Sequence, residues 1–492
     1  MKKILLIITV LFISNACSDD FLDRYPKGRW HHANYKPDDE LDSSILVEAK
    51  LAQVYASLRN YGFIFPAFGM QNYTTPDVEK GSTPSDGQQI VQFKPMSYTA
   101  SNDQIADYYS NCYNSIYLAN EALALALTVD AEAQKNLYLA EGLFLRSMMY
   151  FRLTQAFGGV PYVDKVLGQD EKTPGRMSKE EIWQNLERDL KSAIPILPTR
   201  KMLLSSKNEG RATQNAARAL LAKIYLYQEN WSGALGMTSA IISSGDNSLS
   251  TPYDRMFTEA YEFGEESVFE VYCEEKPAEE IYLGSQFSEI QGIRGIPNLG
   301  WGFNAPSQLL MDSYEEGDPR KEASIISDGE ILEGKKVRAD PNGYKFFNKK
   351  AYTPAAERGI YGRPTDGHGQ WMNIRLIRYA DVVLMHAEAA CESGDISDAL
   401  EKLEMVRARA RGGNNAVLPK ITTTDKDELR AKIHQERRIE LAMEWERFYD
   451  LVRWDEASSV IPNFVVGKHE LFPIPQTEID KSEGVITQNP GY

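Results

Sequence analysis

Three carboxylates near the end of the chain have a spacing that glycosidic-bond cleavage could use. Glu436, Glu440 and Glu444 recur every four residues, so on a helix they share one face. A glycosidase needs two carboxyl groups about 5–9 Å apart, one of them a general acid. Nearby arginines would lower the pKa values of paired carboxylates and make them poor general acids. We therefore favour an ion-pair network that fixes the helix, in which the expected partners are Arg437, Arg438, Arg447 and Arg453.

Other patterns that could carry chemistry are weak. The segment GEILEGKK (329–336) has the Gly-x4-Gly-Lys outline of a phosphate loop, but it lacks the Ser or Thr that would hold magnesium. The pair His31-His32 has no second cluster of ligands near it in the sequence, and neither HExxH nor GxSxG occurs. We predict no catalytic residue, no metal site and no cofactor.

The N-terminus has the pattern of a lipoprotein signal peptide. Lys2 and Lys3 precede an apolar run, ILLIITVLFI, whose ten residues are too few to span a bilayer, which needs about 20. Small residues follow, and Cys17 stands directly after the expected cleavage point. In a lipoprotein that thiol carries the diacylglyceryl group, and attached acyl chains anchor a protein by about 0.8 kcal/mol per buried CH₂. We predict lipidation at Cys17; a plain signal peptide with a chance cysteine is the alternative.

Composition narrows the class of protein further. The chain has 492 residues, 42% of them hydrophobic and 25% charged, as in ordinary globular proteins, and it could form two or three domains or one large one. A net charge of -16 argues against binding to nucleic acid or to anionic lipid headgroups. Cys112, Cys273 and Cys391 form no CxxC pair, so we interpret them as buried free thiols.

Most of the chain has helical periodicity. SNCYNSIYLANEALALAL and AEGLFLRSMMYFRLTQAF carry apolar residues at three- and four-residue spacing, and Gly158-Gly159-Val160-Pro161 should end the second helix. Two later segments, around residues 212–245 and 379–410, have the small residues of tetratricopeptide helical hairpins. The residues at the matching offsets are Leu221, Ala222, Tyr225 and Ala234 in the first segment, and Ala387, Ala390, Gly394 and Ala399 in the second.

The sequence between these hairpins, roughly 245–370, is rich in glycine, proline, asparagine and isolated aromatic residues. SVFEVYC is its one strand-like run. A long charged helix should follow over 425–454, and then a proline-punctuated tail that lies extended over the body. The predicted fold is mostly α, with tetratricopeptide-like helical hairpins packed against an irregular, loop-rich half that has a few short strands.

Eight segments, in order, resemble the SusD/RagB family of surface lipoproteins, which take part in glycan and nutrient uptake by Gram-negative bacteria. The resemblance covers nearly the whole chain, and most of the matching residues are scaffold. The segments are CSDDFLD, SIYLANEAL, AEGLFLRSMMYFRLTQAFGGVPYV, RATQNAARALLAKIYLY, APSQLLMDSYEEGDPR, RYADVVLMHAEAACESGDISDALEKLEMVRARA, ERRIELAMEWERFYDLVRW, and LFPIP with QNPGY.

The resemblance implies a lipid-anchored protein on the outer membrane that faces the cell exterior and is not an enzyme. It implies a SusC-like TonB-dependent transporter as partner, on which this protein sits as a hinged lid. It also implies a division of the chain into a signal peptide (1–16), an N-terminal helical region (17–250) and a C-terminal region (251–492). The C-terminal region would hold ligand-binding loops, the second hairpin and the tail.

In this family the ligand contacts come from variable loops, which correspond here to about 72–93 and 282–301. No residue-level motif transfers within these loops, so the ligand residues are inferred from chemistry. Aromatic rings can cover the apolar faces of sugars while a few polar groups fix the orientation. The expected contacts are Tyr73, Gln88, Phe287, Arg294 and Trp301.

We therefore predict a surface lipoprotein that binds oligosaccharide or polysaccharide fragments and delivers them for import. A peptide- or glycopeptide-binding protein of the RagB type is the first alternative. A helical glycoside hydrolase that uses Glu436 or Glu444 is a second alternative. A scaffold without a ligand is a third, but it leaves the long loops unexplained.

Overall fold

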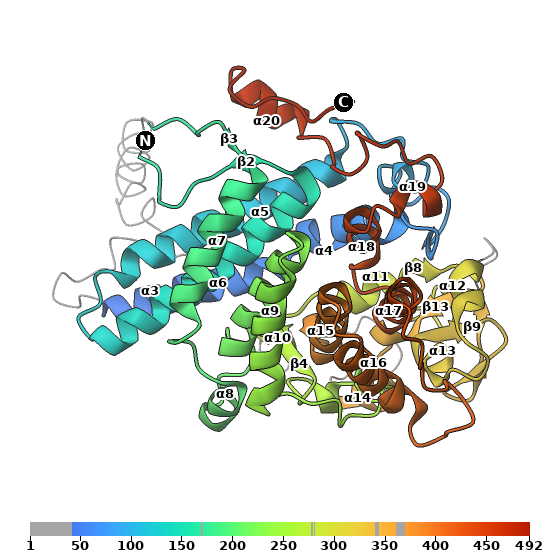
Figure 1. The fold of residues 1–492 in the computed structure, drawn as a ribbon. Coiled ribbons are helices and arrows are strands. Elements are labelled where there is room, and N and C mark those ends of the chain that lie inside the picture. The colour runs from blue at the N-terminus through green and yellow to red at the C-terminus, as the bar shows by residue number, and fades with distance from the viewer. Residues whose placement is uncertain (1–41, 169–170, 277–278, 280, 340–343, 361–369) are drawn as a thin grey trace, which may run out of the picture.

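The computed structural model describes residues 42–168, 171–276, 279, 281–339, 344–360 and 370–492. The leader, Cys17 and His31-His32 lie outside the described residues. Long helices form the first half of the fold (Figure 1). They are α3 (Ser43–Ser57), α5 (Asp103–Ala126), α6 (Glu132–Phe157), α7 (Lys179–Ala193), α9 (Gln214–Tyr227) and α10 (Trp231–Ser244), with shorter turns α4 (Tyr61–Ala67), η2 (Phe68–Tyr73), η3 (Ile90–Gln92) and α8 (Arg200–Ser206).

Side-chain caps start several of these helices. Asn102 accepts hydrogen bonds from the backbone N–H groups of Gln104 and Ile105 at the start of α5. Ser178 and Glu181 form a reciprocal capping box on α7. Gly158 ends α6 with φ of 70°, a left-handed conformation that glycine adopts without strain. The predicted helices and the predicted stop at Gly158 are confirmed.

Two helical hairpins stack on each other at the centre of the molecule. Helices α9 and α10 form the first, and α15 (Tyr379–Ser393) and α16 (Ile396–Arg411) form the second, with α10 packed against α15 (Figure 1). Ala222, Ala234 and Ala387 are completely buried, because small side chains allow the helices to approach closely. A Cβ at Gly233 would lie 2.8 Å from the Tyr225 ring. The expected hairpins are confirmed.

Short two-stranded ladders and loops make up the other half. The predicted strand SVFEVYC forms β4 (Ser267–Val271), which pairs antiparallel with β14 (Ile374–Arg378). The remaining ladders are β1 (Val78–Gly81) with β8 (Phe303–Pro306), β2 (Val160–Pro161) with β3 (Arg176–Met177), β5 (Glu274–Lys276) with β6 (Ile281–Leu283), β7 (Gly295–Ile296) with β12 (Arg338–Ala339), β9 (Ile325–Ser327) with β13 (Phe346–Asn348), and β10 (Ile331–Leu332) with β11 (Lys335–Lys336).

Short helices and turns separate these ladders and follow the hairpins. They are η4 (Glu259–Tyr261), α11 (Phe287–Gln291), α12 (Gln308–Ser313), α13 (Pro319–Ser324), η6 (Lys349–Ala351), α14 (Ala355–Ile360), α17 (Lys426–Glu440), α18 (Arg447–Arg453), α19 (Ala457–Val460) and α20 (Gln476–Lys481).

The segment with the phosphate-loop outline is a tight β-hairpin. Ile331–Leu332 and Lys335–Lys336 are its strands, and Glu333 and Gly334 form the two-residue turn with φ values of 52° and 75°. A phosphate loop instead connects a buried strand to a helix. The structure therefore excludes a phosphate loop here.

The single helix predicted over 425–454 is wrong. Helix α17 ends at Glu440, and α18 begins only at Arg447. Between them Met443 and Trp445 have φ values of 66° and 67°, which a continuous α-helix does not allow. The break turns Trp445 into the core, where it is 4% exposed.

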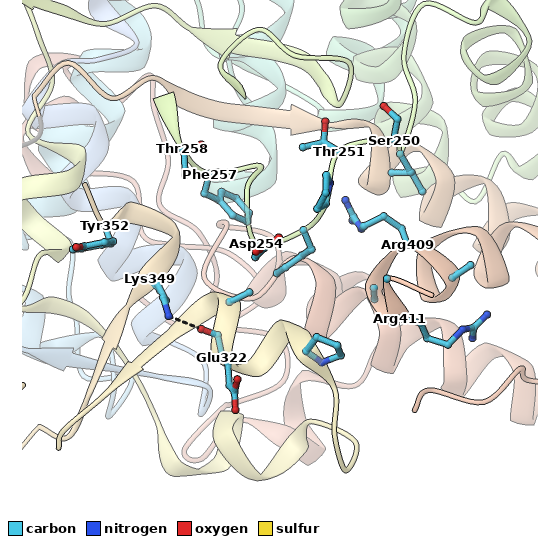
Figure 2. A pocket seen from close by; sticks show the side chains of 18 of the residues that line it. Ser250, Thr251, Asp254, Phe257, Thr258, Glu322, Lys349, Tyr352, Arg409 and Arg411 are labelled. Atoms are coloured by element: carbon cyan, nitrogen blue, oxygen red, sulfur yellow. Dashed lines mark hydrogen bonds between the residues drawn. The ribbon is translucent and has the colours of Figure 1, made fainter. Parts of the chain in front are cut away.

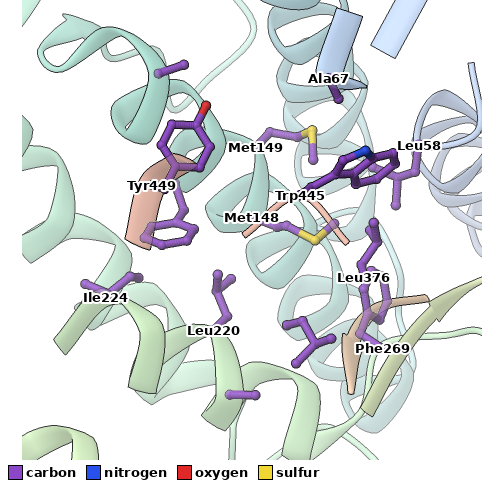
Figure 3. Close-up of a cluster of buried hydrophobic side chains, with 14 of the residues drawn as sticks. Leu58, Ala67, Met148, Met149, Leu220, Ile224, Phe269, Leu376, Trp445 and Tyr449 are labelled. Carbon is purple, nitrogen blue, oxygen red and sulfur yellow. The ribbon is translucent and has the colours of Figure 1, made fainter. Parts of the chain in front are cut away.

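One large hydrophobic core joins both halves of the chain. It extends from Val47 in α3 to Ile486 in the tail and includes residues on both sides of position 250. Phe144 of α6, for example, packs edge-to-face on Phe269 of β4 with ring centroids 5.0 Å apart. Figure 3 shows Leu58, Met148, Phe269 and Trp445 meeting within this core.

The three described cysteines are free and buried, as expected. Burial, together with the Glu392 carboxylate, raises the pKa of the Cys391 thiol to about 11, so it is protonated and unreactive at neutral pH. No helix in the described part of the chain is long and apolar enough to cross a membrane. Among the same residues, no group of three metal-ligating side chains comes together.

Candidate functional site

The five side chains expected to contact a ligand separate into two groups. Tyr73 is 0% exposed, so its ring is not accessible to a ligand in this structure. Phe287 is partly buried and packs against Phe68 and Trp445, at centroid distances of 5.8 and 5.7 Å. Phe68 and Trp445 are themselves 5.4 Å apart, so the three rings form a triangle beneath the surface. Tyr73 therefore belongs to the hydrophobic core, and Phe287 packs against that core.

Gln88, Arg294 and Trp301 lie at the surface. Gln88 is exposed, and Trp301 is partly exposed. Arg294 donates a hydrogen bond from Nη1 to Asp86 Oδ2 over 2.5 Å, and both side chains are about one-third exposed. The Trp301 ring meets the Tyr61 ring edge-to-face at 6.2 Å, and Tyr61 is 40% exposed. We call Tyr61, Asp86, Gln88, Arg294 and Trp301 the loop surface.

Strand pairing brings the two loops of this surface together. β1 pairs with β8, and the N–H of Ser82 donates to the carbonyl oxygen of Gly302 over 2.7 Å. Gly81 and Gly302 both have positive φ, and a Cβ on Gly81 would lie 2.0 Å from that carbonyl oxygen. The backbones touch because no side chain separates them. This contact brings the loop of Asp86 to the loop of Arg294.

The aromatic part of the loop surface is braced from within. Tyr61 stacks on Phe65 at 5.0 Å with an interplanar angle of 13°, and Phe65 meets Phe303 edge-to-face at 5.1 Å. Phe65 and Phe303 are each only 5% exposed. The rings of Tyr61 and Trp301 therefore stand on a fixed base, and little conformational entropy is lost when a ligand covers them.

Hydrogen bonding fixes the charges of the loop surface. The Ser82 hydroxyl, helped by Thr83 and Arg294, lowers the pKa of Asp86 to about 2, so this carboxylate is ionised at neutral pH. Burial, with a smaller effect of Asp107, raises the pKa of Tyr61 to about 12. Tyr61 therefore keeps its proton and can donate a hydrogen bond to a ligand. The surface offers two rings, one ion pair and neutral donors.

Two members of the loop surface were not identified from the sequence. Tyr61 belongs to the run YGFIFP, which has the apolar character of a core segment, and only its exposure sets it apart. Asp86 lies in a glycine- and serine-rich loop, and its pairing with Arg294 spans 208 residues. No local pattern encodes such a pairing.

The three late carboxylates are buried in ion pairs, but the predicted partners are wrong. Glu436 accepts hydrogen bonds from Arg320 at 2.5 Å and Arg407 at 2.9 Å. Glu440 contacts Arg320, Arg378 and Arg409, and Glu444 contacts Arg378 and Lys350. These cations come from other elements. The four arginines predicted as partners pair with other acids: Arg437 with Asp381 and Asp450, Arg438 and Arg447 with Asp77, and Arg453 with Glu388 and Asp450.

This network disfavours the glycosidase hypothesis. Burial alone would raise the pKa of Glu444, but Arg378 and Lys350 together lower it below the ordinary value. Arg409, Arg378 and Arg320 lower the pKa of Glu440 in the same way against the effect of burial. A carboxylate held ionised by several cations makes a poor general acid.

A groove of about 720 Å³ lies elsewhere, between residues 249–258, the start of α13, η6 and the end of α16 (Figure 2). We call it the α16 groove. Its aromatic residues are Tyr253 and Phe257, which are 5% and 8% exposed, and Tyr352, which is partly exposed. Arg409 lies 5.1 Å from the Tyr253 ring centroid, and Lys350 lies 5.1 Å from that of Phe257. Cations therefore cover the rings of Tyr253 and Phe257, while the hydroxyl of the third aromatic residue, Tyr352, donates a hydrogen bond to Glu333.

Comparison with known proteins agrees with the fold. A family model described as "Starch-binding associating with outer membrane" matches residues 33–226, and the model "SusD family" matches residues 265–470. The chain belongs to the SusD-like family, and the resemblance inferred from its sequence is confirmed.

Individual relatives cover most of the chain. SusD-like protein P2 of Formosa agariphila is 26% identical over 80% of this chain and 81% of its own length. A SusD-like protein of Bacteroides ovatus is 25% identical over 92% of this chain and 82% of its own. The solved structure of a laminarin binding SusD-like protein superposes with a TM-score of 0.75 at 28% identity, covering 91% of this chain and 99% of that protein.

Proposed function

We propose that this protein binds oligosaccharide fragments through the loop surface and passes them to a SusC-like TonB-dependent transporter for import. Two observations carry the proposal: the contact of the exposed Tyr61 ring with the partly exposed Trp301 ring, and the Asp86–Arg294 ion pair. Sugar hydroxyls are already satisfied by water, so hydrogen bonds alone add little net affinity. Rings that cover the apolar face of a pyranose supply most of the binding affinity, and the ion pair orients the sugar hydroxyls.

The relatives support a carbohydrate ligand. One solved relative at 28% identity is described as laminarin binding. The paired state of Glu436, Glu440 and Glu444 supports binding without hydrolysis. A protein that releases its cargo to a transporter needs only modest affinity.

The location belongs to the same proposal. Lipidation of Cys17 would hold the protein on the outer membrane, facing the cell exterior. The description of one matching family model associates the family with the outer membrane. Co-purification of the transporter encoded nearest to this chain's gene tests the partner.

The ligand site is tested by calorimetry on a panel of oligosaccharides that includes laminarin fragments. Tyr61→Ala and Trp301→Ala should each weaken binding about ten-fold, since loss of a central contact typically costs more than 1 kcal/mol. Tyr261→Ala is the matched control, because Tyr261 is a 37% exposed tyrosine on η4, outside the loop surface. Melting curves check folding.

Full binding by a well-folded Tyr61→Ala/Trp301→Ala variant would place the ligand elsewhere. Tight binding of a peptide together with no binding of any glycan would favour the peptide-binding alternative. Release of reducing ends from the panel would instead indicate an enzyme.

A further inference from the structure

A ring-lined cavity lies outside the loop surface and shares no residue with it. Its volume is about 280 Å³, and it lies between α5, the segment that follows β2, and α20 with the tail after it. Figure 1 shows these elements together at one end of the molecule. We call it the α5 pocket. Its lining residues are Tyr109, Tyr113, Ile116, Tyr117, Asn120, Pro161, Val163, Lys165, Leu167, Thr173, Glu478 and Ile486.

Three tyrosines form one wall of the α5 pocket. Tyr109, Tyr113 and Tyr117 recur every four residues on α5 and therefore share one face of the helix. Their exposure rises along the row: Tyr109 is 3% exposed, Tyr113 is partly buried, and Tyr117 is 48% exposed. Among the residues that the structure describes, no lysine or arginine lies over these rings, whereas cations cover the Tyr253 and Phe257 rings of the α16 groove. Tyr117 thus presents ring surface at the mouth of a cavity.

The opposite wall is held rigidly. Asn120 donates hydrogen bonds from Nδ2 to the carbonyl oxygens of Val163 and Lys165, at 2.9 and 3.2 Å. Arg146 donates to Asn120 Oδ1 at 3.0 Å and to the carbonyl oxygen of Asp164 at 2.7 Å. Asn120 and Arg146 are 2% and 5% exposed. Buried polar bonds therefore fix the backbone of residues 163–165 against α5.

Apolar and polar side chains both lie at the mouth of the pocket. Val166 and Val485, which lie next in sequence to the lining residues Leu167 and Ile486, are 38% and 50% exposed. Thr173 is exposed, and Lys165 and Glu478 add polar groups of both signs. A ligand that matches this lining has an apolar face and several hydroxyls. Lys165 and Glu478 already pair with Glu171 and Lys481, at 2.6 and 2.8 Å. An extended acyl chain exceeds the volume of the pocket, which is near the lower end for ligand pockets, about 300–1,000 Å³.

We propose that the α5 pocket is a second carbohydrate site, which holds a single pyranose unit against the ring of Tyr117. Occupancy of this pocket does not require the loop surface. A glycan branch or chain end that enters it would give the protein two points of attachment to one polymer. Two linked contacts raise avidity without raising the affinity of either one.

Saturation-transfer NMR with methyl pyranosides of glucose, galactose, mannose and xylose tests the proposal. The signal of at least one pyranoside should persist in the Tyr61→Ala/Trp301→Ala variant. It should fall at least five-fold in Tyr117→Ala, and also in Leu167→Trp, which fills the cavity without changing any residue of α5. Tyr261→Ala should leave the signal unchanged.

Three results would overturn the second site. The first is loss of every pyranoside signal in the loop-surface variant with full signal in both pocket variants. The second is absence of any pyranoside signal from the wild-type protein. The third is displacement of the pyranoside by lauric acid with micromolar affinity, which would make the pocket an acyl-chain site. Oligosaccharide binding at the loop surface is measured separately, so each proposal can fail alone.

Discussion

Replacing Glu436 with glutamine tests the view that the late carboxylates stabilise the fold and take no part in chemistry. Glu436 is 3% exposed and bonds to Arg320 at 2.5 Å and Arg407 at 2.9 Å. Removing one partner of a buried ion pair costs about 3–5 kcal/mol, because the other charge stays buried. Arg320 keeps Asp318 at 2.9 Å, and Arg407 keeps Glu315 at 2.7 Å. Because both arginines keep a second partner, we expect Glu436→Gln to lower the free energy of unfolding by about 3 kcal/mol, the lower end of that range.

The expected shift in melting temperature is small but measurable. An unfolding entropy of about 2.1 cal/mol/K per residue over roughly 450 folded residues gives about 1 kcal/mol/K, so Glu436→Gln should lower Tm by about 3 °C. Differential scanning calorimetry measures the shift. Glu483→Gln is the control, because its pair with Lys172 is exposed and should change Tm by less than about 1 °C.

Ligand binding separates a structural role from a functional one. Glu436→Gln should bind oligosaccharide as the wild type does, since its carboxylate lies in the core and not on the loop surface. A variant that keeps the wild-type Tm while losing affinity would refute the structural assignment. Hydrolysis of the glycan panel by the wild type that the variant lacks would refute it in favour of an enzyme.

Three further outcomes are expected. Burial, followed by the charge of Glu270, raises the pKa of Glu262 from 4.5 to about 9. The folded protein therefore holds a proton that the unfolded chain releases, so the free energy of unfolding should fall as pH rises from about 5 to 9. Urea unfolding of Glu262→Gln should show a weaker dependence on pH, and a dependence equal to that of the wild type would contradict the assignment. Gly81→Ala should lower the free energy of unfolding by more than about 1–2 kcal/mol, because a Cβ there would lie 2.0 Å from the carbonyl oxygen of Gly302 and φ is 75°. It should also weaken glycan binding, and an unshifted melting curve would refute the close contact. Cys17→Ala should abolish labelling by a clickable fatty acid and release the protein from membranes, and an unlabelled wild type would disprove the anchor.

Local sequence signals predicted the helices but not the long-range partners. The periodicity of α5 and α6 and the stop at Gly158 are local features, and the structure confirms them. The break after Glu440 has no glycine or proline to announce it. It arises because Glu444 pairs with Arg378 and Lys350, while Trp445 enters the core beside Phe68.

The candidate site was predictable only as a pair of loops. The resemblance gave their positions, and Gln88, Arg294 and Trp301 reach the surface as expected. Tyr73 does not, because its loop begins inside the buried turn η2. Whether an aromatic ring points outward depends on the packing beneath it, which the composition of a loop does not specify.

The triangle of Phe68, Phe287 and Trp445 has a consequence for how the chain acquires its structure. Its three rings come from the beginning, middle and late parts of the sequence, so a growing chain cannot cover Phe68 until Trp445 has been synthesised. The ladder of β1 with β8 likewise waits for residues more than 200 positions away. Such distant contacts slow folding. Most of the chain is therefore expected to leave the ribosome before its final core can close, and a copy truncated ahead of Trp445 should aggregate through the uncovered rings.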